Sequence, residues 1–119
     1  MSKKIIVIED NHDILDMIAY ILEDEGYEVI SSLDAEPLND IESHKPDLVL
    51  LDDWLADGYG HQLCGQLKAN PATNHIPVLL VSSVQNLKEL AKLSKADGYI
   101  HKPFDIDYLI DVVKDHLKG

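Results

Sequence analysis

Three short apolar runs constrain the fold more than any other feature of this chain. They cover residues 5–8, 48–51 and 78–81, and each is continuous over the length of one strand. A strand with one face exposed to solvent would alternate apolar and polar residues, whereas a continuous apolar run is typical of a strand covered on both faces, as in a parallel sheet. Two weaker runs, residues 27–32 and 98–101, bring the expected strands to five.

Amphipathic segments separate these runs. After the first run, apolar residues recur at helical spacing, and Gly26 follows where a C-terminal cap would lie. Further helices are expected over residues 35–44, 59–69, 86–95 and 106–117. Alternation of strands and helices predicts an α/β fold with a doubly wound parallel sheet and right-handed crossovers. No linker, repeat or low-complexity segment divides the chain, so we expect residues 1–119 to form one domain.

Charge and composition limit the partners of the chain. Ten Lys and Arg residues against 22 Asp and Glu residues give a formal net charge of −12, which repels a phosphate backbone or an anionic lipid surface. We therefore expect contacts with proteins, no direct DNA binding and no membrane association. Cys64 is the single cysteine and no apolar run reaches membrane-spanning length. Both features favour a cytoplasmic protein.

Polar side chains follow the ends of the expected strands. They are Glu9 and Asp10, Asp52 and Asp53, Ser82, and Lys102. Ligands of open parallel sheets bind at the carboxyl ends of the strands, so this edge is the expected site. Carboxylates crowded together repel one another, which raises their pKa values unless a cation compensates.

Mg²⁺ is the expected cation, because it prefers oxygen ligands and is commonly held by one or two carboxylates together with a phosphate. We expect Asp10 and Asp52 to bind it directly, Glu9 to hold a metal-bound water, and a backbone carbonyl near Trp54 to complete the ligand set. A carboxylate beside such a metal can also attack phosphorus and form an aspartyl phosphate. Lys102 would then stabilise the charge of the transferred group, and a nearby hydroxyl would assist.

Five pieces of sequence, in this order and spacing, resemble a response-regulator receiver domain of two-component signalling. They are IIVIEDN (5–11), PDLVLLD (46–52), Gly60 eight places beyond Asp52, IPVLLVSS (76–83) and ADGYIHKPF (96–104). The likeness covers essentially the whole chain. It implies a flavodoxin-like receiver fold with strand order 2-1-3-4-5, like that of chemotaxis receivers, in one receiver domain.

The resemblance also implies roles for individual residues. These are the phosphoacceptor Asp52, the acidic pair Glu9 and Asp10, the switch hydroxyl Ser82, the switch aromatic Tyr99 and the phosphate-contacting Lys102. It further implies Mg²⁺ as cofactor and a cis peptide bond between Lys102 and Pro103. Such a protein is a phosphoacceptor that assists its own phosphorylation and dephosphorylation rather than an enzyme acting on other molecules.

The implied partners are a sensor histidine kinase or phosphotransfer protein and a downstream protein target. Phosphorylation would change the face formed by the fourth helix, the fifth strand and the fifth helix. A basic stripe and an acidic stripe on this face could pair in a phosphorylation-dependent homodimer. They are Lys88, Lys92 and Lys95, and Asp107, Asp111 and Asp115. The chain is expected to be a stand-alone regulator or the receiver portion of a longer protein.

Several positions depart from the family pattern. Ala56 stands where proline is usual, which predicts a less rigid loop. Asp53 should point to the opposite side from Asp52, and we expect a solvated loop acid. Trp54 and Val84 are apolar at the two positions that influence hydrolytic water, which predicts slow loss of the phosphoryl group. The six histidines form no pair with ligand spacing, so none is assigned a role.

Three alternatives differ in what the site would do. A receiver-like module that is silent to phosphorylation and only docks a partner remains open because of Asp53 and Ala56. A haloacid-dehalogenase-like phosphatase is disfavoured, because it needs a second aspartate two places beyond the first, where Trp54 stands. A flavodoxin-like FMN carrier is also disfavoured, because its first loop must cradle a phosphate and this chain has consecutive acids there, Glu9 and Asp10.

Overall fold

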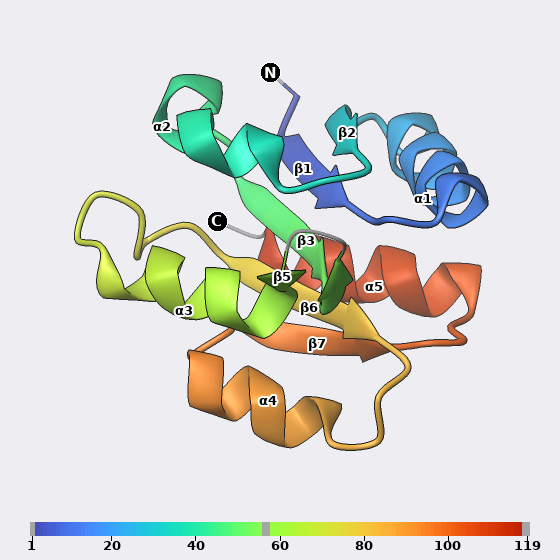
Figure 1. The fold of residues 1–119 in the computed structure, drawn as a ribbon. Coiled ribbons are helices and arrows are strands. Elements are labelled where there is room, and N and C mark those ends of the chain that lie inside the picture. Colours follow the sequence, from blue (N-terminus) through green and yellow to red (C-terminus); the bar gives the residue numbers. More distant parts are fainter. Residues whose placement is uncertain (1, 56–57, 118–119) are drawn as a thin grey trace.

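The fold is built on a five-stranded parallel sheet in the computed structural model, which describes residues 2–55 and 58–117. Its strands are β1 (Lys4–Ile8), β2 (Glu28–Ser32), β3 (Leu48–Asp52), β6 (Val78–Ser82) and β7 (Gly98–His101). The strand order is β2-β1-β3-β6-β7 (Figure 1). This confirms the predicted order 2-1-3-4-5 and places the ends of β1 and β3 side by side.

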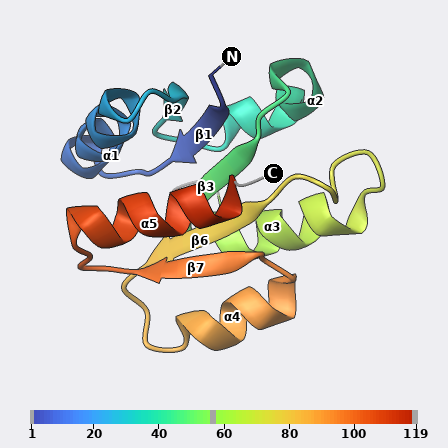
Figure 2. The same ribbon diagram turned by 180° about the vertical axis from the view of Figure 1, so that it is seen from behind.

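Helices cover both faces of the sheet. They are α1 (His12–Asp24), α2 (Ile41–His44), α3 (Gly60–Ala69), α4 (Leu87–Ser94) and α5 (Ile106–His116). Helices α1 and α5 lie on one face, and α2, α3 and α4 lie on the other (Figures 1 and 2). Across the described ranges, no helix has both the length and the apolar character needed to cross a membrane.

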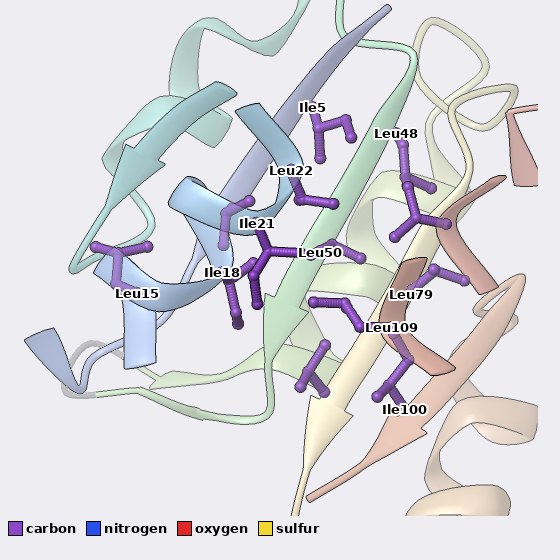
Figure 3. Close-up of a cluster of buried hydrophobic side chains, with 13 residues drawn as sticks. Ile5, Leu15, Ile18, Ile21, Leu22, Leu48, Leu50, Leu79, Ile100 and Leu109 are labelled. Atoms are coloured by element: carbon purple, nitrogen blue, oxygen red, sulfur yellow. The ribbon is translucent and has the colours of Figure 1, made fainter. Parts of the chain in front are cut away.

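Two apolar clusters, one on each side of the sheet, explain why the strand sequences are continuous. Ile5 and Val7 pack toward α1 and α5, whereas Ile6 and Ile8 pack toward the opposite helices. Figure 3 shows the cluster between the sheet and α1 and α5. Each buried Ile or Leu side chain contributes roughly 1.5–3 kcal/mol relative to an exposed one. Both clusters together therefore hold the strand ends at one edge in fixed register.

Helix α1 begins directly after the acidic end of β1. The Asn11 side chain caps it by accepting the Ile14 N–H at 3.0 Å. At its other end Gly26 adopts a φ of 95°, a left-handed conformation that confirms the predicted cap. The N-terminal cap fixes the short loop that carries Asp10.

The segment predicted as a helix over residues 35–44 is less regular than expected. A 3₁₀ turn, η1 (Glu36–Asp40), leads into a single turn of α-helix, α2. Pro37 lies in the first turn of η1 and donates no backbone hydrogen bond. Lys45, with a φ of 50°, ends α2. The other predicted helices end within two residues of their expected limits.

A short antiparallel hairpin follows β3, which the sequence did not predict. It consists of β4 (Trp54–Leu55) and β5 (Gly58–Tyr59), with Trp54 paired to Tyr59. Figure 1 shows it beside the arrowhead of β3. Ala56 lies outside the described residues, so the prediction of a less rigid loop there stays a prediction.

Candidate functional site

Three carboxylates meet at the carboxyl edge of the sheet. Ile8 pairs with Leu51, so the residues that follow, Glu9 and Asp52, come next to each other. Each of Glu9, Asp10 and Asp52 has an oxygen within 4.8 Å of the others. Asp52 is 4% exposed and Glu9 is 1% exposed, whereas Asp10 is open to solvent. The cluster borders a hollow of about 380 Å³.

Burial and repulsion change the acidity of Asp52. They raise its pKa from the ordinary value of 3.8 to about 7, with burial as the larger cause and the neighbouring Glu9 as the next. The charge of Lys102 and the backbone N–H of Trp54, 3.4 Å from Asp52 Oδ1, act in the opposite direction. The site therefore carries more negative charge than its own cation neutralises.

Lys102 supplies that cation from the end of β7. Its Nζ lies 2.6 Å from Glu9 Oε1 and 3.7 Å from Asp52 Oδ1. Its backbone N–H donates to the Ser82 carbonyl at 2.8 Å, which ties the β7 end to the β6 end. The peptide bond between Lys102 and Pro103 is cis, as the resemblance implies.

Ser82 and Tyr99 lie on one face of the sheet. Ser82 is buried at the end of β6, and its Oγ accepts the Val84 N–H at 3.3 Å. Tyr99 pairs with Leu80 across β6 and β7 and packs, half-buried, against the cluster that includes α4. Since side chains two apart along a strand point the same way, Ser82 and Leu80 share this face. The structure thus brings the predicted switch hydroxyl and switch aromatic to the same side.

The donor set fits a hard divalent cation such as Mg²⁺. Three carboxylates converge from two adjacent strands, and one lysine balances only part of their charge. Trp54 lines the same hollow and is 62% exposed. Its backbone N–H lies 3.4 Å from Asp52 Oδ1, so its main chain borders the acidic cluster. This is the place expected for a carbonyl ligand.

A larger hollow of about 490 Å³ lies at the opposite edge of the sheet, where Lys45 and His75 are among its lining residues. Among the described residues, the group of three candidate metal ligands is the one at the carboxyl edge, not in this hollow. Chemistry therefore favours the smaller hollow as the functional site.

Gly60 packs directly against the acceptor strand. A Cβ at this position would collide with the backbone carbonyl of Asp52 and would come within 2.9 Å of the Asp53 Cα. The Gly60 N–H also donates to the Asp53 carbonyl at 2.8 Å. Glycine eight places beyond Asp52 thus allows α3 to begin against the end of β3.

Asp53 is buried, so the prediction of a solvated loop acid is wrong. The residue is 2% exposed and its Oδ1 accepts the His61 N–H at 2.8 Å. The same oxygen lies 2.6 Å from His61 Nδ1. Side chains alternate along β3, so Asp53 points away from Asp52 and toward the face that α3 covers. Asp53 directly follows the last residue of β3 and is covered by the start of α3, which explains why its side chain is buried.

His61 and Asn11 were missed as contributors to this region. Asn11 donates its N–H to Glu9 Oε2 at 3.1 Å and so helps to orient that carboxylate. A signal for His61 was available: an acid at an inward-facing position needs a cationic or hydrogen-bonding partner, and His61 lies in the first turn of the helix expected to cover it. The spacing of the histidines bears only on metal ligation and therefore gives no indication of this pairing.

Comparison with known proteins identifies the family. Residues 5–114 match the model of the response regulator receiver domain. The chain is 37% identical over 105 residues to the alkaline phosphatase synthesis transcriptional regulatory protein PhoP of Bacillus subtilis, which covers 87% of this chain and 44% of PhoP. It is 29% identical to the polar-differentiation response regulator DivK of Brucella anthropi, with 98% of each chain covered.

Solved structures show the same fold. The CheY-like response regulator receiver domain protein of Methanospirillum hungatei superposes with a TM-score of 0.89 at 30% identity, over 98% of this chain and 94% of that one. Among the two relatives named above, the chain spans about half the length of PhoP and nearly all of DivK. On its sequence, its strand order and the residues that meet at the carboxyl edge of its sheet, this chain belongs to the response regulator receiver domain family of two-component signalling.

Proposed function

We propose that this receiver domain accepts a phosphoryl group on Asp52 in a reaction that requires Mg²⁺. The observation that supports this most is the buried Asp52 carboxylate, which has Glu9 and Asp10 on one side and the Lys102 ammonium 3.7 Å away. Excess negative charge favours a divalent cation, and the lysine can contact a phosphoryl group as it arrives. Bound Mg²⁺ would neutralise charge on the carboxylates and on the phosphoryl oxygens.

The transfer is a displacement at phosphorus. One Asp52 carboxylate oxygen forms the new bond to phosphorus, while the bond from phosphorus to the donor breaks and its electron pair leaves with the donor. The donor is the phosphohistidine of a sensor kinase or phosphotransfer protein, or a small acyl phosphate. Hydrolysis regenerates the free Asp52 carboxylate: water attacks phosphorus, the bond from phosphorus to the Asp52 oxygen breaks, and inorganic phosphate is released.

Residues around Asp52 have separate roles. Lys102 moves from Glu9 toward the phosphoryl oxygens and stabilises their charge, which its position 2.6 Å from one carboxylate and 3.7 Å from the other supports. The Ser82 hydroxyl donates to a phosphoryl oxygen. Asp10, Asp52 and the Trp54 carbonyl would hold the metal, and Glu9 would contact it through a water.

Phosphorylation switches a protein-interaction surface. When Ser82 turns toward the new oxygens, space opens on its face of the sheet and Tyr99 moves inward from its half-buried position. The residues that respond are those of α4, β7 and α5. Tyr99 belongs to β7 and packs in the cluster that includes α4, and α5 follows β7 in the chain. A downstream protein reads this face.

A homodimer is one form that this output can take. The basic and acidic stripes named above are all exposed on the described surface of α4, the residue that follows it, and α5. Opposite stripes would pair across a two-fold interface, with the strongest effect at low salt.

We also propose that residues 1–119 form one receiver domain, which is cytoplasmic and contacts neither DNA nor a membrane directly.

The chemical stability of the label tests the proposed linkage. Protein labelled with radioactive acetyl phosphate and Mg²⁺ is expected to lose the label in neutral hydroxylamine, because hydroxylamine cleaves an acyl phosphate. A label on a hydroxyl group, such as that of Ser82, would remain. Label that resists hydroxylamine, or that persists in Asp52→Asn, would contradict the proposal.

A further inference from the structure

Asp53 and His61 join the strand that carries Asp52 to the helix that covers it. The Asp53 carboxylate is almost fully buried and receives two hydrogen bonds from one residue, the His61 backbone N–H at 2.8 Å and the His61 ring nitrogen Nδ1 at 2.6 Å. Because a carboxylate accepts, Nδ1 carries the hydrogen. The Asp53 carbonyl also accepts the Gly60 N–H at 2.8 Å.

These contacts close the base of the β4–β5 hairpin. The hairpin begins with Trp54, directly after Asp53, and ends with Tyr59, shortly before His61. Its aromatic rings continue the connection: the Tyr59 ring stacks on His61 with centroids 5.5 Å apart, and the Trp54 ring meets Tyr59 edge-on at 5.3 Å. A continuous series of contacts thus runs from the buried carboxylate to the residue at the rim of the acidic hollow.

We propose that the Asp53–His61 pair is a positioning pair, which holds the hairpin and the Trp54 main chain against the acidic hollow and thereby sets the affinity of the site for Mg²⁺. The inference rests on the proposed function, since it concerns the same metal site. Asp53 contacts neither metal nor phosphoryl group, because its side chain points to the α3 face. It acts through its two chain neighbours, Asp52 and Trp54.

Hydrogen bonds hold the hairpin and the Trp54 main chain in a defined position better than apolar packing would. Both donors come from His61 and converge on a single oxygen, Oδ1, so they fix direction as well as distance. The Asp53 backbone N–H also donates to Val81 of β6 at 3.4 Å. Asp53 is therefore held from the sheet on one side and from α3 on the other. Loss of the pair would free the segment that supplies two of the proposed metal ligands.

Asp97 offers a matched control at the other edge of the sheet. Its carboxylate also combines one cation with one backbone donor, Lys68 Nζ at 2.6 Å and the Val78 N–H at 2.8 Å. Asp97 precedes β7, so it lies at the amino end of the strands, away from the acidic hollow. The Asp97 side chain is 39% exposed, so Asp97→Asn should lower stability less than Asp53→Asn does, and it has no route to the metal.

The experiment measures Mg²⁺ binding by calorimetry in the wild type, Asp53→Asn, His61→Leu and Asp97→Asn. We expect the dissociation constant to rise about tenfold in the Asp53 and His61 variants, as is usual when a residue that supports metal ligands is lost. Asp97→Asn should bind Mg²⁺ like the wild type. Equal affinity in all four folded proteins would overturn the proposal, as would equal weakening in Asp97→Asn.

Amide hydrogen exchange without metal separates this inference from the proposed function. Faster exchange at Trp54 and Tyr59 is expected in Asp53→Asn and His61→Leu but not in Asp97→Asn. Failure of the wild type to bind any Mg²⁺ would refute the proposed function and the metal part of this inference together. Unchanged exchange in both pair variants would refute the positioning role itself, whether or not Mg²⁺ binds.

Discussion

Replacing Asp52 with asparagine should stabilise the metal-free protein above neutral pH. In the folded chain, burial and the neighbouring Glu9 raise the pKa of Asp52 from 3.8 to about 7. At higher pH the folded protein must therefore keep a carboxylate that burial and repulsion disfavour. Asparagine has nearly the same shape and carries no charge, so the penalty disappears. The variant loses the proposed phosphoacceptor and gains stability through the same change.

The size of the gain follows from the pKa change. A difference of about three pH units, at about 1.4 kcal/mol for each, gives roughly 4 kcal/mol above pH 7 as an upper figure. Between the unfolded and folded pKa values the folded state binds more protons, so wild-type stability falls as pH rises from about 4 to about 7. The advantage of Asp52→Asn should shrink to about 1–2 kcal/mol near pH 5.

Urea unfolding of both proteins in EDTA, at about pH 5 and about pH 8, measures this difference, with circular dichroism as the signal. Adding Mg²⁺ should then stabilise the wild type more than the variant, by about 2.7 kcal/mol at a hundred times the dissociation constant. A variant no more stable than the wild type at the higher pH would refute the electrostatic reasoning. A gain that is the same at both pH values would refute it as well.

Three further results are expected. Trp54→Asn should shorten the lifetime of the phosphoprotein, because a polar side chain at the rim can orient a water, and an unchanged rate of label loss would show that Trp54 only packs. Gly60→Ala should destabilise the fold by roughly 1–3 kcal/mol or more, since the added Cβ collides with the Asp52 carbonyl; thermal unfolding would show this, and Gly65→Ala, where nothing lies within 4 Å, is the control. Phosphorylation should raise the sedimentation coefficient at several protein concentrations and less so at high salt, whereas identical sedimentation would count against the proposed dimer.

The three central strands, β1, β3 and β6, were predictable because they are buried on both faces. A run such as residues 48–51 cannot alternate when helices pack on each side, so composition alone marks the strand. The edge at which Glu9, Asp52 and Lys102 meet follows from parallel strands ending together. Strand order came from the resemblance, since local pattern does not determine which strands are neighbours.

Features that depend on tertiary contact were harder to predict. Two residues on each side form the β4–β5 hairpin, too few to leave a periodic pattern. In the segment predicted as one helix over residues 35–44, a 3₁₀ turn with Pro37 in its first turn precedes a single α-helical turn. For Asp53, the alternation along β3 gave the correct direction and, with it, the need for a partner from the covering helix. The two contacts that His61 makes with one carboxylate oxygen depend on how α3 packs against the strand end.

Intact mass after incubation with acetyl phosphate tests the central claim most directly. Wild type with Mg²⁺ should gain the mass of a single phosphoryl group, and wild type with EDTA should gain none. Asp52→Asn should remain unmodified with Mg²⁺, whereas Asp53→Asn should still be labelled, because Asp52, and not Asp53, lines the acidic hollow. An adduct on Asp52→Asn, or its absence from the wild type under conditions that label another receiver domain, would contradict phosphorylation of Asp52 as the function of this site.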